Sequence, residues 1–249
     1  HQSMLRELGT RMRDPTAIVE LRGITKRFPG IIACDRVDLR VYPGQIHALL
    51  GENGAGKTTL MHILYGLQQP DSGEICIDAQ PTVICSPKDA IRAGIAMVFQ
   101  HFTLIPSLTV AEKIALAGPS SQLFVRHKWL AASVQVLAEQ YRLAVDPNSH
   151  VWQLSVGEQQ RVEILKLLHR RARLLILDEP TAVLTPQESA ALLQTIRQLA
   201  AVGHAVILPD AGFVLNVRRR NQNFGAFAAS RGSTAYVPPR THSAPRRSS

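Results

Sequence analysis

A nine-residue glycine-rich segment constrains this chain more than any other part of its sequence. Residues 51 to 59 match the pattern G-x-x-x-x-G-K-[ST]. The apolar run Ile46–Leu50 before them predicts a buried strand, and Leu60–Tyr65 after them predicts a helix. A strand, a glycine-rich turn and a helix N-terminus form a cradle for anions, because backbone N–H groups converge there and the helix dipole adds positive charge. The predicted phosphate-binding loop consists of Gly51, Glu52, Asn53, Gly54, Ala55, Gly56, Lys57, Thr58 and Thr59.

The residue types in this loop indicate what it binds. Gly51, Gly54 and Gly56 let the backbone approach phosphates without a Cβ clash. Lys57 can reach β- and γ-phosphates, and the Thr58 hydroxyl suits Mg²⁺. The alternative is an ordinary glycine-rich turn, but the strand and helix on either side favour a triphosphate bound with Mg²⁺.

Composition and charge narrow the class of protein. The chain has 249 residues, and an apolar share of 45% is enough to form a core. We expect no membrane span, because no run of eighteen apolar residues occurs, and we see no secretory signal peptide. The three cysteines are scattered and show no C-x-x-C spacing, so neither zinc nor a disulfide framework is expected and a reducing cytoplasm fits best.

The net charge of +9 raises the question of nucleic-acid binding. Pro209–Ser249 contains seven arginines and one acid, so this segment carries most of the excess. The rest of the chain is only weakly basic and predicts no basic stripe. We therefore expect no specific nucleic-acid partner.

Apolar runs alternate with helical patterns along most of the chain. Such alternation around a phosphate loop predicts an α/β fold, here with a helical insertion between Gln100 and about Arg173. Helix starts are predicted where Ser86 precedes Pro87 and where S/T-x-x-E patterns begin at Thr109, Ser155 and Thr185. The remaining strands are expected at Ile18–Ile24, Val37–Val41, Glu74–Asp78, Ile95–Phe99, Leu174–Leu177 and Ala205–Leu208.

A second group of candidate residues ends the strand at Leu174–Leu177. Asp178 and Glu179 follow this strand directly. A carboxylate at that position can hold Mg²⁺, and the next can orient or deprotonate an attacking water. On its own such a pair is common by chance.

Two further segments argue against chance as the origin of this pair. Leu154–Arg161 closely resembles the signature segment of ATP-binding cassette (ABC) ATPases, and Met97–Gln100 resembles the strand and glutamine that precede their helical subdomain. The order of phosphate loop, glutamine, signature and acid-ended strand also agrees. The resemblance covers Ala17–Leu208 and implies a P-loop cassette with an N-terminal antiparallel β portion and a helical subdomain at about 101–172.

The resemblance assigns roles to individual residues. Phe28 matches the aromatic that stacks on adenine, although a core phenylalanine is the alternative. Gln100 would contact the metal and the water, the alternative being a solvated glutamine at a strand end. Ser155 and Gly157 would meet the γ-phosphate of ATP bound to the opposite subunit.

For the acids, the resemblance makes Glu179 the general base and Asp178 the Mg²⁺ partner. Together with Lys57 and Gln100, Glu179 completes the expected catalytic set, and Thr58, Gln100 and Asp178 complete the metal set.

The signature segment departs from the commonest form of the family at Val156 and Glu158. Taken together with Gln100–Phe102 and Thr181–Pro186, this segment is more similar to the cassettes of sugar and nucleoside importers. This implies ATP hydrolysis coupled to import at the cytoplasmic face of the membrane. The implied partners are a second cassette and transmembrane permease subunits. Proteins of that group usually carry two cassettes, and only the first is expected here.

The resemblance ends near Leu208. Family cassettes place a switch histidine after this strand, but no histidine stands near Ala211, so we expect ATP binding with weak hydrolysis. No strand is predicted beyond Leu208, which leaves the sheet incomplete. We expect an N-terminal extension at 1–16 and a basic, disordered tail at 209–249, and we hypothesise a change of reading frame near Leu208.

Two other functions remain open. One is a soluble ABC protein of DNA repair or translation, although the short helical insertion without heptads counts against repair. The other is a nonproductive nucleotide-binding fragment with an unfinished sheet edge.

Overall fold

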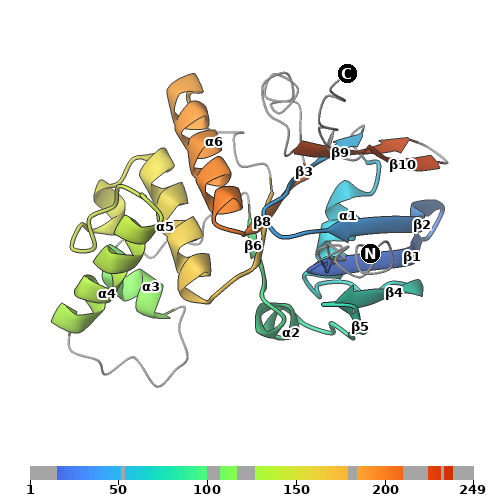
Figure 1. The fold of residues 1–249 in the computed structure, drawn as a ribbon, viewed down its shortest axis with the longest axis horizontal. Helices are drawn as coiled ribbons and strands as arrows, with labels where there is room; N and C mark the ends of the chain where they lie inside the picture. Colours follow the sequence, from blue (N-terminus) through green and yellow to red (C-terminus); the bar gives the residue numbers. More distant parts are fainter. Residues whose placement is uncertain are drawn as a thin grey trace, which may run out of the picture.

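Two β-sheets organise the fold, and helix α1 (Lys57–Leu64) lies between them (Figure 1). A computed structural model describes residues 16–51, 54–99, 107–116, 127–178, 184–209, 224–230 and 233–237. The first sheet is antiparallel with the order β2-β1-β4-β5. Its strands are β1 (Val19–Phe28), β2 (Ile31–Val41), β4 (Ser72–Ile77) and β5 (Gln80–Pro81).

The second sheet is mainly parallel and has the order β10-β9-β3-β8-β7-β6. Its short central strands read as continuous apolar runs because layers of side chains cover both faces. The strands are β3 (Ile46–Gly51), β6 (Ile95–Val98), β7 (Leu174–Leu177), β8 (Ala205–Leu208), β9 (Phe224–Ser230) and β10 (Ser233–Val237).

Two apolar clusters cover the two faces of this sheet. Along β7, Leu174 and Ile176 join the cluster that holds α1 and the antiparallel sheet, while Leu175 and Leu177 join the cluster on the helical side. This alternation follows from the two-residue period of a strand. The core therefore forms two layers, with the parallel sheet between them.

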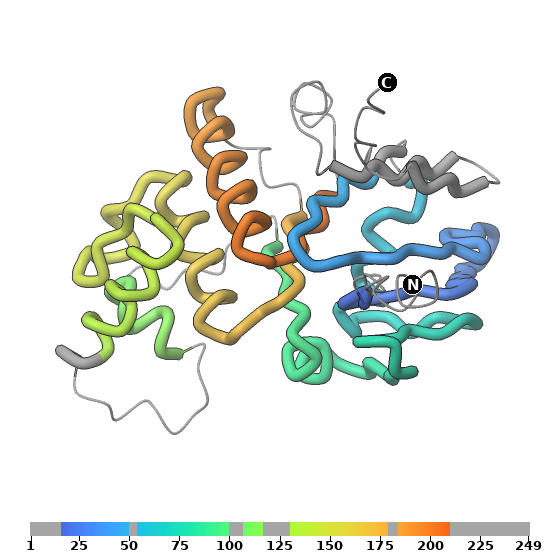
Figure 2. The backbone as a smooth tube through the Cα atoms, in the orientation of Figure 1, coloured from blue at the N-terminus to red at the C-terminus, as the bar shows by residue number. Residues whose placement is uncertain are grey.

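The helical insertion lies between β6 and β7 in the sequence, as predicted, and forms one end of the molecule (Figure 2). Its helices pack against the parallel sheet together with α6, through a shared apolar cluster. Within it, a buried ion pair joins Lys113 to Glu163. The helices are α3 (Val110–Leu116), α4 (His127–Gln140) and α5 (Val156–His169), with α2 (Pro87–Arg92) before them and α6 (Pro186–Ala201) after β7.

The predicted helix starts are confirmed by side-chain caps. Ser86, Ser155 and Thr185 accept hydrogen bonds from the backbone N–H three residues later. Thr109 and Glu112 make the same reciprocal pair before α3. Each cap satisfies N–H groups that a helix start leaves without an intrahelical partner.

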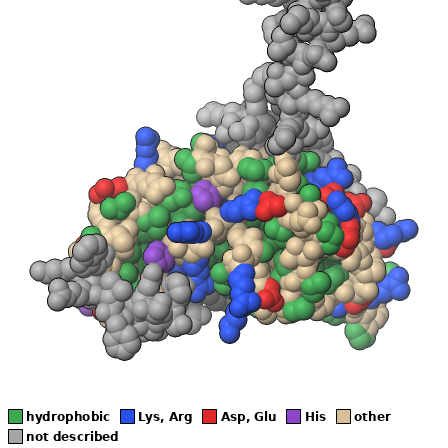
Figure 3. All heavy atoms as spheres, turned by 60° about the horizontal axis from the view of Figure 1, so that its bottom comes forward, with side chains coloured by type: hydrophobic (Ala, Val, Ile, Leu, Met, Phe, Trp, Pro, Cys, Tyr) green, Lys and Arg blue, Asp and Glu red, His purple; other side chains and the backbone are tan. Residues whose placement is uncertain are grey.

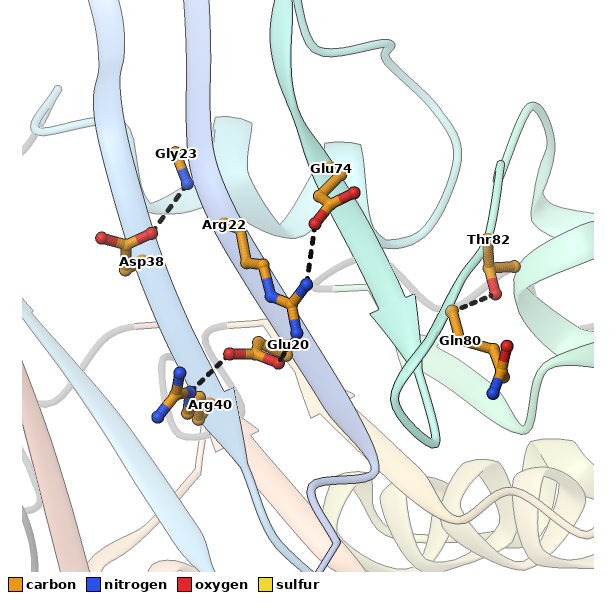
Figure 4. A network of polar contacts seen from close by, with 8 residues as sticks. All are labelled: Glu20, Arg22, Gly23, Asp38, Arg40, Glu74, Gln80 and Thr82. Carbon is orange, nitrogen blue, oxygen red and sulfur yellow. Dashed lines mark hydrogen bonds and ion pairs between the residues drawn. The ribbon is translucent and has the colours of Figure 1, made fainter.

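Ion pairs across neighbouring strands hold the antiparallel sheet together (Figure 4). Glu20 on β1 accepts from Arg40 on β2 and from Arg22, and Arg22 also donates to Glu74 on β4. This network links three strands at the end of β1 that lies away from its turn into β2.

Strands β9 and β10 correct the expectation that no strand follows Leu208. β9 pairs in parallel with β3 from Ile46↔Phe224 to Gly51↔Ala229, and β10 pairs with β9 in antiparallel. The sequence of β9, FGAFAAS, is rich in small residues and lacks a clear strand pattern. Its pairing comes from the open edge of β3 rather than from local propensity.

The described residues show neither a membrane-spanning helix nor, on the face drawn in Figure 3, a continuous basic surface. Among them, no helix is both long and apolar enough to cross a bilayer. On the face drawn in Figure 3, basic side chains form separate groups, several beside acidic ones, rather than one continuous basic stripe.

Candidate nucleotide-binding site

The phosphate loop joins the end of β3 at Gly51 to the start of α1 at Lys57. Glu52 and Asn53 lie outside the described residues. Gly56 is the N-cap of α1 and has a φ of 84°, in the left-handed region that favours glycine. Unlike α2, α5 and α6, α1 starts without a hydrogen bond from a capping side chain. This follows from the N-cap residue itself, because glycine has no side chain that could accept.

Strand β2 supports the loop from behind. A Cβ added at Gly56 would lie 1.9 Å from the carbonyl oxygen of Ala33, so only glycine allows this contact. The neighbouring Cys34 thiol lies 3.7 Å from the Gly56 carbonyl oxygen and donates to it. Burial raises the pKa of the Cys34 thiol to about 11, which keeps the thiol protonated. The antiparallel sheet thus helps to set the shape of the loop.

Phe28 lies on the β1–β2 hairpin, which also carries Ala33 and Cys34. It ends β1, pairs with Ile31, and is 39% exposed, so it is not a core residue. The Lys26 ammonium lies 5.7 Å from the centre of the Phe28 ring and 2.9 Å from Asp71. The exposed ring leaves room for a stacking partner, and its role in binding adenine stays a prediction.

Asp178 lies at the same edge of the parallel sheet as the phosphate loop. β7 and β3 are parallel and separated by β8, so their carboxyl ends are about 10 Å apart. Asp178 is half-buried, and its backbone N–H donates to the Val98 carbonyl oxygen at 3.0 Å. Glu179 and Gln100, which follow β7 and β6, lie outside the described residues.

Thr58 and Asp178 offer oxygen ligands of the kind that Mg²⁺ prefers. Among the described residues, no group of three or more histidines, cysteines or acids could hold a metal by itself. Mg²⁺ usually binds through one or two protein oxygens together with substrate phosphates and water. The donor set therefore fits Mg²⁺ brought in with a triphosphate.

The signature segment begins α5. Ser155 is the N-cap and forms a reciprocal box with Glu158, whose backbone N–H donates to the Ser155 hydroxyl at 3.3 Å. The backbone N–H of Gly157 donates to the Glu188 carboxylate at 3.2 Å. The sequence predicts Glu188 only as part of the box at the start of α6, and its contact with Gly157 joins two helices that no local pattern links.

Among the residues that the structure describes, the signature segment and the phosphate loop begin helices on opposite faces of the parallel sheet. α5 belongs to the apolar cluster on one face of the parallel sheet, and α1 to the cluster on the other. The structure thus places the phosphate loop and Asp178 at one sheet edge, whereas Ser155 and Gly157 begin a helix across the sheet from α1.

The comparison with protein families agrees with this architecture. A family model described as "ABC transporter" matches residues 34–182, which is more than half of the chain. The chain belongs to the ABC transporter family.

Individual ABC proteins are similar to this chain over more residues than the family model covers. The chain is 43% identical to a glucose import ATP-binding protein of Haloferax volcanii, over 90% of this chain and 47% of that protein. It is 48% identical to a guanosine import ATP-binding protein of Bacillus subtilis, over 76% of this chain and 38% of that protein. A ribose import ATP-binding protein of Rubrobacter xylanophilus is 46% identical over the same shares of both chains. The chain therefore spans less than half the length of these relatives.

Solved ABC cassettes share the fold. A nucleotide-free ATP-binding cassette from an ABC transporter matches with a TM-score of 0.74 at 22% identity, over 90% of this chain and 92% of that chain. The cbiO1 protein of Clostridium perfringens, part of the transporter complex cbiONQ, matches with the same TM-score at 23% identity, over 90% and 89%. The predicted cassette fold is thereby confirmed.

Proposed function

We propose that this chain is an ATP-binding subunit that couples ATP hydrolysis to the import of a small solute such as a sugar or nucleoside. The main support is the geometry at the edge of the parallel sheet, where the phosphate loop and Asp178 lie two strands apart. The names of the relatives, which include glucose, guanosine and ribose import proteins, support the class of solute.

In this proposal the chain's own residues divide the work. Backbone N–H groups of the loop and the start of α1 bind the phosphates, and Lys57 binds the β- and γ-phosphates. Thr58 and Asp178 would hold Mg²⁺, which neutralises phosphate charge. Glu179 accepts the proton of the attacking water, and Gln100 orients that water.

The separation of α5 from α1 supports a role for a second cassette. Ser155 and Gly157 begin a helix on the opposite face of the sheet from α1, and in this proposal they complete the ATP site of a partner cassette. A transmembrane permease would contact the helical insertion near 100–108. The chain would then work at the cytoplasmic face of the membrane.

Binding of ATP through Lys57 is the first test of this proposal. Calorimetric titration with Mg-ATP should show saturable binding, and Lys57→Ala should weaken it by about 10- to 100-fold, the value of a charge-assisted hydrogen bond. Lys88→Ala is the matched control, because Lys88 also stands in the first turn of a helix, α2. Equal affinities for the parent and Lys57→Ala would contradict the proposed site.

Slow turnover is the second expectation. The sequence holds no histidine near Ala211, and loss of one positioned catalytic group lowers a rate by about 10²- to 10⁴-fold. We therefore expect Ala211→His to raise steady-state ATP hydrolysis while leaving ATP affinity unchanged. A parent protein that is already as fast as Ala211→His would show that the histidine is not needed.

A further inference from the structure

Glu188 makes contacts at the starts of two helices. It stands three residues after Thr185, the N-cap of α6, and its Oε2 accepts from the Thr185 backbone N–H at 3.0 Å and hydroxyl at 2.9 Å. Its other oxygen, Oε1, accepts from the backbone N–H of Gly157 in α5 at 3.2 Å. One carboxylate thus joins the starts of α5 and α6, through Gly157 and Glu188, which lie 31 residues apart in the sequence.

The glutamate at the same position in α5 behaves differently. The hydrogen bonds of Glu158 go to the backbone N–H and hydroxyl of Ser155, both within its own box and both through Oε2. The contact from Glu188 to Gly157 is therefore additional to what a helix cap requires.

The glycine at 157 permits this approach. A Cβ added there would lie 3.0 Å from Glu188 Oε1 and 3.2 Å from its Cγ, which is tighter than nine in ten real contacts of that kind, so the Glu188 side chain would have to shift by a few tenths of an ångström. Gly157 is the second residue of α5, and an N–H at this position has no partner within its own helix. Glu188 supplies that partner.

The carboxylate is charged at neutral pH. Hydrogen bonds from the Thr185 backbone N–H and hydroxyl lower the pKa of Glu188, and the hydrogen bond from Gly157 adds to this effect. An anion thus already occupies the start of α5, where the helix dipole favours negative charge.

We propose that Glu188 is a positioning residue whose carboxylate holds the Gly157 N–H until the γ-phosphate on a second copy of this chain displaces it. This inference rests on the proposed function, in which the start of α5 completes the ATP site of a partner cassette. Phosphate and carboxylate compete because the Gly157 N–H can donate a strong hydrogen bond to only one anion at a time. They also compete because two negative charges at the same helix start repel each other. Glu188 therefore sets how much ATP is needed to join two cassettes.

The test measures ATP-dependent dimer formation in full-length chains that also carry Glu179→Gln, which removes the proposed base and prevents turnover. Light scattering follows the dimer during titration with Mg-ATP, and calorimetry at protein concentrations below dimer formation measures ATP affinity. Glu188→Gln keeps the shape and the box with Thr185 but loses the charge. We expect the Mg-ATP concentration at half-maximal dimer formation to fall about fivefold, with ATP affinity of the monomer unchanged.

Two further variants make the result specific. Glu112→Gln removes the equivalent charge from the box at the start of α3, and should leave the threshold unchanged. Glu188→Asp shortens the side chain, so it should lose Gly157 and lower the threshold even if Glu188→Gln does not fold. A purely structural role for Glu188 predicts the opposite direction, a lower melting temperature and a higher threshold.

The outcomes separate this inference from the function on which it rests. An unchanged or raised threshold in Glu188→Gln, or ATP binding without any dimer, would overturn the role of Glu188 while leaving ATP binding intact. Absence of ATP binding in the parent chain would overturn the proposed function, and the inference with it.

Discussion

Two glycines of the phosphate loop show how much a single position depends on its neighbours. Gly54 and Gly56 have the same φ of 84°. A Cβ at Gly54 would meet nothing within 4 Å, whereas at Gly56 it would meet the Ala33 carbonyl oxygen at 1.9 Å. At both positions a non-glycine residue would be strained by the left-handed backbone conformation. Only at Gly56 would its Cβ also collide with β2.

Alanine substitutions should separate these two costs. Gly54→Ala should lower the free energy of unfolding by about 1 to 2 kcal/mol, the price of the left-handed conformation. Gly56→Ala should lower it by about 2 to 5 kcal/mol, because the loop must also move away from Ala33, and should weaken ATP binding more than Gly54→Ala does. Urea unfolding and calorimetric titration measure both effects. Equal losses in the two variants would show that contact with β2 does not shape the loop.

At the scale of elements, strand β3 carries a buried histidine beneath the phosphate loop. His47 is 1% exposed, and its Nε2 lies 2.9 Å from the Gln45 side-chain oxygen. Burial lowers the pKa of His47 from 6.5 to about 4. The imidazole of His47 therefore binds a proton more readily in the unfolded chain than in the folded chain.

The stability of the fold should depend on pH through His47. Because the pKa is lower in the folded state, the stabilisation is complete above about pH 6.5 and is lost as the pH falls toward 4. Between pH 7 and pH 5 the free energy of unfolding should fall by about 2 kcal/mol. Urea unfolding at a series of pH values measures the slope, which His47→Gln should remove. If the slope persists in that variant, other groups cause it.

At the scale of the whole molecule, the edge of the parallel sheet decides whether the cassette is complete. β9 covers β3 from Ile46 to Gly51, and β10 extends the sheet further. An uncovered β3 would expose backbone N–H and C=O groups next to the phosphate loop and offer them to other chains. The pairing of β9 counts against a fragment with an unfinished sheet edge.

Two truncations test the contribution of β9 and β10. A chain ending at Pro209 should aggregate or melt about 5 °C lower, because it exposes the edge of β3. A chain ending at Val237 keeps both strands and loses only the last residues, so it should melt like the parent. Size-exclusion chromatography and a thermal melt provide the readout. A monomeric and equally stable chain ending at Pro209 would show that the two strands add nothing.

The features that sequence analysis predicted correctly are those with short-range causes. The helix starts at Ser86, Thr109, Ser155 and Thr185 follow from a side chain and an N–H three residues apart. Strands β3, β6, β7 and β8 follow from short apolar runs. Each of these features depends on neighbouring residues in the sequence and not on the tertiary contacts of the segment.

The features it missed have long-range causes. Nothing in the sequence of β9 indicates a strand, and its pairing depends on β3, which lies far away in the chain. The contact of Glu188 with Gly157 and that of Gly56 with Ala33 also join separate elements.

The linear chain alone specified a glycine-rich turn between a strand and a helix, an acid-ended strand, capped helices and the family, because each depends on residues close together in sequence. Folding decided which groups share a sheet edge, which strand covers β3, and which carboxylate reaches the start of α5. These outcomes depend on how two sheets and a helical layer pack around common cores, and packing brings together atoms whose spacing along the chain carries no trace of their contact.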